Sequence, residues 1–469
     1  MLTSLDVGCQ QLGTSFTGAK GEVKLMTLDP GHFHAALVQK TMYDQVSPTV
    51  YVYAPQGPEL QDHLGRIRGF NTRDTDPTAW IEKVYTGPDF LERMLRERPG
   101  NVVVISGNNA QKTDYILRSV QAGIHVLADK PMVITPEQFP ILIEAFRTAE
   151  KKGVLLYDIM TERYEITTIL QKELAHIPEV FGQLEKGTPE EPAVTKESVH
   201  HFFKSVAGSP LTRPGWFFDA QQQGEGLVDV STHLADLIQW ECFPEQIIRY
   251  KTDIEVVAAQ RWPTELSLAQ FQEVTRLEAF PPFLNNAIED GKLKVYCNGR
   301  MTYTIKGIHA KVSVTWNFRA PEGGGDTHAS ILRGTRCALI IRQDREENFQ
   351  PTLYVEARGG NDIGILLKKA IAETLQTQYP GIGLQSLSEG RWMVSIPAKY
   401  RVGHEAHFTQ VTEKYLRFLA QGRLPEWEVP NMIAKYYTTT TALRMARPSA
   451  DSRPRSNDGS DSGARTDLP

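Results

Sequence analysis

Residues 101–131 read NVVVISGNNAQKTDYILRSVQAGIHVLADKP. Two mainly apolar runs in this stretch, residues 101–106 and 125–128, are typical of strands that are buried on both faces. The segment between them, residues 113–122, has the pattern of a helix and is followed by Gly123, a residue type favoured just after a helix end. A strand, a helix and a second strand in this order predict two parallel strands joined by a helical crossover.

The same alternation continues on both sides of this unit. It predicts strands at 23–28, 49–53 and 154–157, and helices at 32–38, 88–98 and 136–152. Because parallel strands need crossovers that cover the sheet, residues 23–158 are predicted to form a doubly wound α/β domain of the Rossmann type. Residues 1–22 are polar and dotted with glycine, and they are predicted to be a loose N-terminal extension.

The pattern changes after residue 158. Strand-like segments without intervening helices follow at 292–296, 301–305, 311–316, 338–342 and 352–357. These segments predict a C-terminal α+β domain over residues 159–446, with an open, mostly antiparallel sheet. Helices are predicted at 167–174, 229–240, 404–420 and 431–445. Residues 447–469 are rich in Ser, Asp, Arg, Pro and Gly, and they are predicted to be disordered.

Composition excludes several classes of protein. The 469 residues carry a formal net charge of −5, and this lack of a basic surplus argues against a nucleic-acid partner. The four cysteines form neither a zinc pattern nor a disulfide framework, which fits a reducing cytoplasm (Cys9, Cys242, Cys297 and Cys337). Residues 1–17 do not resemble a signal peptide, and no apolar run has membrane-spanning length. We therefore expect a cytoplasmic protein without a membrane partner.

The loop after the first predicted strand is where a Rossmann domain binds the pyrophosphate of a dinucleotide. It reads Asp29-Pro30-Gly31-His32-Phe33-His34, so only Gly31 of the usual three glycines is present. An ordinary turn ahead of a core helix is the alternative interpretation. His32 and His34 are expected to diverge at a helix start, which favours packing or substrate contact over a metal, and no metal is predicted. Gln56 follows the second strand, where an acidic residue usually binds the ribose.

Asp129-Lys130-Pro131 stands at the carboxyl end of a predicted strand, where open α/β sheets bind their ligands. Lys130 can hydrogen-bond a substrate hydroxyl and stabilise negative charge that develops there. The alternative is a surface lysine in a loop. Ser106 and Asn108 follow the neighbouring strand and are predicted to contact the same ligand.

The second chemical signature is Asp229, His233 and Asp236, which a helix would place on one face at i, i+4 and i+7. A neutral His233 can accept the proton of an alcohol, and Asp229 can orient the imidazole or bind a hydroxyl. The alternatives are a packed histidine between solvated aspartates, or, less favoured, ligands of a divalent metal. Two aromatic and basic segments, 200–204 and 213–217, and the segment 162–164 are candidates for the edge of a sugar site, with Arg163 and Trp216 as predicted substrate contacts.

The segments 105–109, 122–131 and 224–236, in this order, resemble the Gfo/Idh/MocA oxidoreductases, the glucose-fructose oxidoreductase and inositol dehydrogenase group. The family pattern has an acidic residue, Lys and Pro after an AGxHV strand, and an Asp-xxx-His in the second domain; Asp129 stands here in place of the usual Glu. The resemblance implies NAD or NADP as cofactor, sugar-like substrates, and a homodimer or homotetramer. It also implies Lys130, Asp229 and His233 as the active-site set. The expected cofactor contacts are Gly31, His32, Phe33, Gln56, Ser106, Asn108, Asp129 and Lys130.

Three functions are compatible with these residues. The leading hypothesis is a dehydrogenase that oxidises a secondary alcohol of a sugar or polyol by hydride transfer to NAD(P). The second is redox-assisted cleavage of a glycoside with a tightly bound NAD at the same site. The third is a catalytically silent module that senses a sugar or a dinucleotide, because the altered phosphate loop and the long second domain depart from the family pattern.

Overall fold

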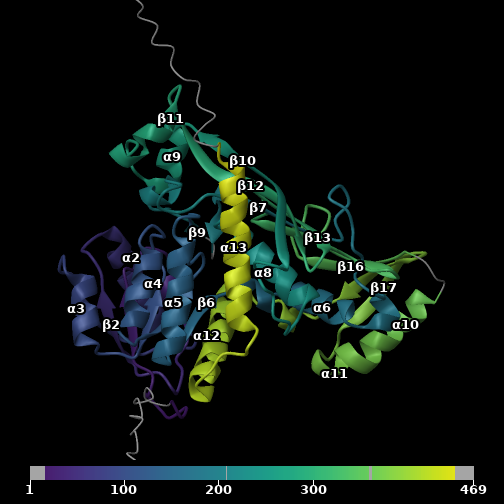
Figure 1. Ribbon diagram of the computed structural model, residues 1–469, viewed down its shortest axis with the longest axis horizontal. Helices are drawn as coiled ribbons and strands as arrows, with labels where there is room; N and C mark the ends of the chain where they lie inside the picture. Colours follow the sequence, from purple (N-terminus) through teal and green to yellow (C-terminus); the bar gives the residue numbers. More distant parts are fainter. Residues whose placement is uncertain (1–15, 207–208, 359–361, 449–469) are drawn as a thin grey trace, which may run out of the picture.

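The computed structural model describes residues 16–206, 209–358 and 362–448. Its first domain is a six-stranded sheet in the order β3-β2-β1-β4-β5-β6, and every neighbouring pair in it is parallel (Figure 1). This order confirms the predicted doubly wound Rossmann sheet. The strands are β1 (Leu25–Leu28), β2 (Thr49–Tyr53), β3 (Ile81–Tyr85), β4 (Val102–Ile105), β5 (His125–Asp129) and β6 (Leu156–Ile159).

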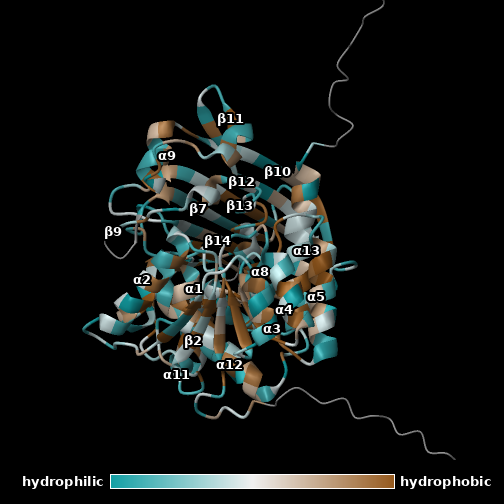
Figure 2. Ribbon diagram, turned by 90° about the vertical axis from the view of Figure 1, so that its left-hand side faces the viewer, coloured by the Kyte–Doolittle hydropathy of each residue, from teal (hydrophilic) through white to brown (hydrophobic). Residues whose placement is uncertain are grey.

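The central strands of this sheet are buried because their side chains are apolar on both faces. Every residue of β1 and β4 is buried, and in Figure 2 the strands of this sheet are largely brown. The helices around the sheet are α1 (His34–Leu37), α2 (Pro58–Thr72), α3 (Phe90–Glu97), α4 (Lys112–Gln121) and α5 (Phe139–Lys152). The sequence pattern missed α2 and β3. The reason is weak apolar periodicity: α2 buries only Leu60, His63 and Ile67, and β3 is a mostly exposed edge strand.

The second domain contains a ten-stranded sheet with the path β10-β12-β13-β7-β14-β15-β16-β18-β17, with β11 paired to β12. Its pairs are antiparallel except β13 with β7, which confirms a mostly antiparallel sheet. The two strands predicted at 292–296 and 301–305 are one long strand, β12. The strands are β7 (Val194–Phe203), β10 (Ile254–Leu266), β11 (Ile288–Glu289), β12 (Lys292–Ile305), β13 (Ile308–Arg319), β14 (Thr327–Arg333), β15 (Cys337–Arg342), β16 (Thr352–Ala357), β17 (Gly383–Ser388) and β18 (Arg391–Ser395).

Helices pack on this sheet from the side that faces the first domain. Helix α6 contacts β15, α8 contacts β13, and α13 contacts β10. The helices of this half are α6 (Ile166–Ala175), α7 (Pro178–Phe181), α8 (Ser231–Cys242), α9 (Leu268–Thr275), α10 (Ile363–Ala370), α11 (Gln376–Gln378), α12 (His404–Gln421) and α13 (Glu428–Ala446), with 3-10 turns η1 (Thr161–Tyr164), η2 (Gly215–Phe218), η3 (Pro282–Ala287) and η5 (Ala398–Tyr400), the π-helical turn η4 (Ile371–Leu375) and the small pair β8 (Ser205–Val206) and β9 (Ser209–Pro210).

The chain returns to the first domain through α12. Phe408, Tyr415 and Leu419 of this helix belong to the same buried cluster as the strands of the parallel sheet, and the Tyr415 ring stacks on Tyr157 with the centroids 6.0 Å apart. Figure 1 shows α12 beside β6, between the two sheets. A helix far along the chain thus completes the core of the N-terminal domain. The predicted division at residue 158 assigned this helix to the second domain.

Within the predicted loose extension, residues 1–22, the structure differs at Phe16. Phe16 is buried, and its ring meets His125 of β5 edge-on at 5.1 Å. Residues 1–15 lie outside the described residues, as do 449–469 of the predicted disordered tail. Arg447, at the start of that tail, donates to Glu225 at 3.1 Å. Among the described helices, none has the length and apolar character needed to cross a bilayer.

Candidate active site

Lys130 and Asp229 meet between the two domains. Lys130 follows the last residue of β5, and its Nζ donates to Asp229 Oδ1 at 2.7 Å. Gln223 donates to the other carboxylate oxygen of Asp229 at 3.0 Å. Burial alone would raise the pKa of Asp229, but the Lys130 charge and these hydrogen bonds outweigh it and lower the pKa. The pair is therefore ionised, and it joins the two predicted signatures into one site.

The spacing predicted that Asp229, His233 and Asp236 share one helix face. In the structure Asp229 does not lie on that face. Helix α8 begins at Ser231, and residues 227–230 form turns ahead of it. The cause is the approach of this segment to β12: a Cβ on Gly226 would lie 2.0 Å from the carbonyl oxygen of Cys297. Only a glycine can stand at this close contact between two backbones.

His233 is a neutral histidine in the first turn of α8. Burial, followed by the charges of Lys130 and His404, lowers the pKa of His233 well below its ordinary value. Its Nδ1 is buried without a hydrogen-bond partner among the described residues. Its lowered pKa keeps the imidazole uncharged at neutral pH, and an uncharged imidazole has a nitrogen lone pair that can accept a proton.

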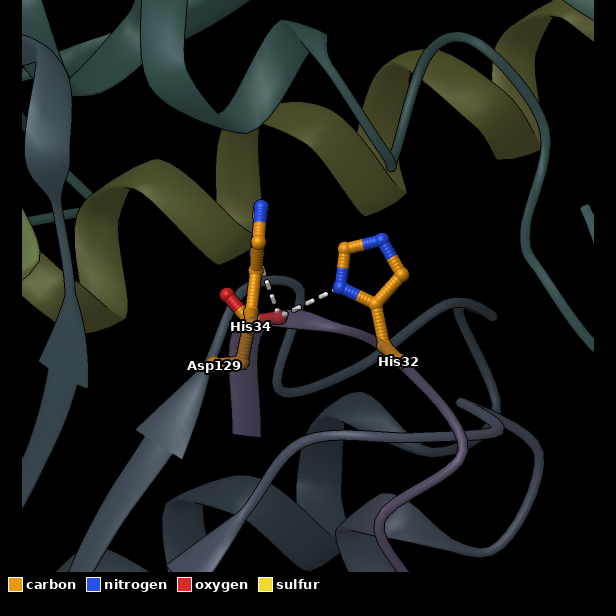
Figure 3. A group of neighbouring side chains, drawn as sticks. All are labelled: His32, His34 and Asp129. Carbon is orange, nitrogen blue, oxygen red and sulfur yellow. Dashed lines mark hydrogen bonds and ion pairs between the residues drawn. The ribbon is translucent and has the colours of Figure 1, made fainter. Parts of the chain in front are cut away.

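A second polar cluster forms at the carboxyl end of β5 (Figure 3). Asp129 Oδ2 accepts from His34 Nδ1 at 3.0 Å and from Ser106 Oγ at 2.9 Å, and His32 Nδ1 lies 3.4 Å away. Lys112 Nζ donates to the backbone oxygen of Asp129 at 3.0 Å. Burial opposes the charge of Asp129, but the two imidazoles and Lys112 hold its pKa well below the usual range. Ser106 thus orients Asp129. The contact of Ser106 with the cofactor remains a prediction.

His32 and His34 converge on Asp129, whereas the sequence predicted that they diverge. His32 precedes the first residue of α1, so the two rings do not follow helical spacing, and their centroids lie 4.0 Å apart. Two imidazoles and a carboxylate can ligate a metal by type. Burial lowers the pKa of His32, and the nearby ammonium groups of Lys130 and Lys112 lower it further. The same two ammonium groups would also repel a cation. We therefore interpret the cluster as hydrogen-bonded.

The loop after β1 is packed tightly against the loop after β4. A Cβ on Gly31 would lie 3.4 Å from Asn108 N and 3.5 Å from Trp216 Cζ2. Asn108 is turned to the second domain, where its amide donates to Gln222 Oε1 at 2.7 Å. Trp216 is buried and covers the loop instead of lining an open cleft. The roles predicted for these three residues toward ligands are not tested by these contacts.

The carboxyl edge of the parallel sheet fits a dinucleotide in three respects. It presents a backbone-only position at Gly31 and an exposed Gln56 after β2. It also holds His32, whose Nδ1 lies 3.4 Å from Asp129 Oδ2 but outside hydrogen-bond geometry. Phe33 lies at the same edge, with the Arg66 guanidinium 5.6 Å from its ring centre. A ligand with phosphate, ribose and amide groups can satisfy such a set.

The packing of these loops gives a test. Gly107→Ala is expected to destabilise the protein by about 1–3 kcal/mol, because the new Cβ would lie 2.2 Å from the carbonyl oxygen of Asp29 and 2.8 Å from Gly31 N. Urea unfolding of the variant and the wild type measures this difference. Gly123→Ala, at a position with open space but a φ of 75°, serves as the comparison for backbone strain alone. Equal stability of Gly107→Ala and the wild type would contradict the packing.

Arg163 and Asp236 form a buried ion pair. Arg163 Nε and Nη2 donate to the two oxygens of Asp236 at 2.6 and 2.7 Å, and both residues are buried. Arg163 also pairs with Glu428 at 3.2 Å, and Lys435 donates to Asp236 at 2.7 Å. With its nitrogens bound to carboxylates of the protein, Arg163 is not carried into the proposed substrate site. Asp236 likewise belongs to this network and not to the Lys130–Asp229 pair.

Three groups of the site had no clear signal in the sequence. Gln223 fixes Asp229, Lys112 fixes the backbone of Asp129, and His404 comes from the start of α12, with its ring 5.3 Å from that of His34. A glutamine, a lysine and a histidine separated by up to 292 positions can be related only by the fold.

Glu162 is a second carboxyl group near Lys130, in addition to Asp229. Burial and the charge of Glu165 raise the pKa of Glu162 to about 7. The acid is therefore protonated in the fold at pH values where it is ionised in the unfolded chain, so its contribution to stability falls as pH rises from about 4.5 to about 7. Glu162→Gln is expected to remove this fall. The thermal midpoint as a function of pH measures it, with Glu322→Gln as an exposed control; parallel curves for Glu162→Gln and the wild type would contradict it.

Comparisons with known proteins agree with this architecture. Residues 61–157 match the family described as "Oxidoreductase family, NAD-binding Rossmann fold", and residues 170–447 match "Putative oxidoreductase C terminal domain". Together with the parallel sheet and the site at its carboxyl edge, these matches define an NAD-binding, two-domain oxidoreductase. The second match spans more than half of the chain, and the chain belongs to the Gfo/Idh/MocA oxidoreductase family.

Among solved structures, the chain is similar to a "putative oxidoreductase" from Parabacteroides merdae ATCC 43184, with 59% identity, a TM-score of 0.90 and coverage of 92% of this chain and 99% of that one. Levoglucosan dehydrogenase in complex with NADH and levoglucosan shares the fold at 12% identity and a TM-score of 0.56, over 90% and 97% of the chains. "Putative oxidoreductase YteT" of Bacillus subtilis (strain 168) is 24% identical over 164 residues, which is 34% of this chain and only 35% of that protein.

Proposed function

We propose that this protein oxidises a secondary alcohol of a sugar or polyol, with His233 as proton acceptor. The observation that carries the proposal is the 2.7 Å ion pair between Lys130 and Asp229, which is assembled from two domains at the carboxyl edge of the dinucleotide-binding sheet. A bound, oxidised nicotinamide supplies the hydride-accepting carbon. The chain's own residues must therefore position the alcohol and remove its proton.

Each residue has a separate task in this proposal. Lys130 donates a hydrogen bond to the substrate oxygen and stabilises the negative charge that develops there. Asp229 holds the ammonium group in place and accepts from a neighbouring hydroxyl. His233 takes the hydroxyl proton, since burial keeps its imidazole neutral. The similar fold of levoglucosan dehydrogenase supports a sugar-like substrate class.

The test uses the full chain with NAD or NADP and a panel of sugars, sugar acids and polyols. We expect reduced nicotinamide with at least one substrate, detected by its absorbance. Release of any retained dinucleotide by denaturation identifies the cofactor independently of turnover. Sugar released from glycosides without net reduced nicotinamide would favour redox-assisted cleavage instead. Dinucleotide binding without any turnover would favour a sensing role and contradict the dehydrogenase.

A further inference from the structure

Arg213 is a buried arginine held at the wall of the second domain. Its side chain is 6% exposed, Nε donates to the carbonyl oxygen of Phe202 at 2.9 Å, and Nη2 donates to that of His201 at 3.0 Å. The guanidinium carbon lies 4.4 Å from the ring centre of Phe217 and 5.2 Å from that of Trp316. Two backbone oxygens and two aromatic faces thus fix the group without neutralising its charge.

The third guanidinium nitrogen of Arg213 is free to bind a ligand. Nη1 has no hydrogen-bond acceptor among the described residues, and no described carboxylate forms an ion pair with Arg213. A buried cation without a counter-charge is costly. Burial lowers the pKa of Arg213 to about 10, at which the group is still a cation near neutral pH.

Arg213 lies close to the proposed catalytic pair. Phe202, Phe217 and Trp316, which surround the guanidinium, line one small cavity of about 10 Å³ together with Asp229. Asp229 and Asp326 are the two carboxylates whose charges act on Arg213. Arg213 itself does not line this cavity, but its guanidinium lies beside the aromatic residues that border the space next to Asp229.

The other charges of this wall are already balanced. Lys130 is paired with Asp229, and Lys204 is paired with Asp326, which also accepts from His200 Nδ1 at 2.9 Å. Glu162 is half protonated near neutral pH because its pKa is raised to about 7. In contrast to Lys130 and Lys204, Arg213 has no ion pair with a described carboxylate.

We propose that Arg213 binds a carboxylate of the substrate, so that the protein acts on a sugar acid in preference to a neutral sugar. This inference rests on the proposed function and specifies its substrate class. A single uncompensated positive charge matches a carboxylate, whereas a phosphate monoester carries about −1.5 to −2 at neutral pH. Charge-assisted hydrogen bonds from a guanidinium to a carboxylate are among the stronger hydrogen bonds in proteins.

The experiment compares each sugar acid with its methyl ester, which keeps the shape and removes the charge. Binding to the wild-type protein with NAD is measured by calorimetry, and turnover is measured by formation of reduced nicotinamide. For the acid that the protein uses best, we expect affinity and kcat/KM to exceed those of the ester by about 10- to 100-fold. A wild-type protein that binds esters as well as acids would overturn the inference.

Arg213→Met is expected to reduce the acid-to-ester ratio to near one, and Arg213→Lys to restore part of it. Arg319→Met is the matched control, because Arg319 also lies over an aromatic ring, Phe203 at 4.2 Å, but is exposed and paired with Glu273. An unchanged ratio in folded Arg213→Met would overturn the inference. Should that variant fail to fold, the acid and ester comparison on the wild type still decides.

The outcomes separate this inference from the proposed function. Acids bound in preference to esters without any reduced nicotinamide would support the carboxylate site and contradict the dehydrogenase. Reduced nicotinamide formed equally well from acids and esters would support the dehydrogenase and overturn the carboxylate site. Absence of acid binding to the wild type would overturn the inference whatever the turnover.

Discussion

His233→Ala is expected to lower kcat by about 10²- to 10⁴-fold, the contribution usual for a positioned general base. The stability of the variant should change little, because the buried Nδ1 of His233 makes no hydrogen bond to the described residues that would be lost. Steady-state kinetics and a urea midpoint measure the two effects separately. His309→Ala, on β13, is the control histidine. A variant with wild-type kcat would contradict the assignment of the base.

The pH profile gives a second readout for His233. Because burial keeps the pKa of His233 well below its ordinary value, the base stays neutral when the pH falls through the usual histidine range, about 6.5. We expect kcat to persist through that range, and to be lost only at lower pH. A profile that falls with a midpoint near 6.5 in the wild type, and not in a Glu162→Gln background, would assign the titration to Glu162 instead.

Asp236→Ala is expected to destabilise the protein by about 3–5 kcal/mol, because it removes a carboxylate from a buried network and leaves two cations without it. Lys435 is fully buried and lies between Asp236 at 2.7 Å and Asp158 at 2.8 Å. Arg163 would keep only Glu428. These groups come from β6, η1, α8 and α13. Loss of the Asp236 carboxylate should therefore disrupt the contact between the two domains. Chemical denaturation measures the change.

The exposed pair of Glu265 and Lys292 is the matched comparison for this network. Its side chains are 46% and 56% exposed, and Glu265→Ala is expected to cost no more than about 1 kcal/mol. The buried network should also respond to acid. Burial opposes the charge of Asp236, but Arg163 and Lys435 lower its pKa below the ordinary value. Its contribution is therefore present above the unfolded pKa and is lost as pH falls. Similar losses for Asp236→Ala and Glu265→Ala would contradict this account.

Local sequence was sufficient where one property of a segment controlled its structure. Residues 101–106 and 125–128 are apolar on both faces, and only a buried parallel strand accommodates that pattern. Lys130 directly follows such a strand, so its position at the ligand-binding edge follows from chain order. The edge strand β3 and the polar helix α2 lacked this property and were missed.

The partners of the polar residues depended on tertiary structure. Asp229, His233 and Asp236 have helical spacing in the sequence, yet close contact between Gly226 and β12 places Asp229 in a turn. Asp236 turns to Arg163 and Lys435 in a buried network. Spacing along one chain segment cannot encode these contacts, because their partners lie 73 and 199 positions away.

The sequence by itself determined the parallel sheet and the mostly antiparallel second sheet, because each follows from local patterns of burial. The resemblance to a known family, and not a burial pattern, implied that the lysine segment and the histidine segment belong to one site. The tertiary structure alone decided which charges are neutralised. It directs Arg163 into an ion-pair network, whereas the partners of Arg213 among the described residues are backbone oxygens and aromatic rings. Whether an arginine is free to bind a ligand depends on the carboxylates around it, and these come from distant parts of the chain.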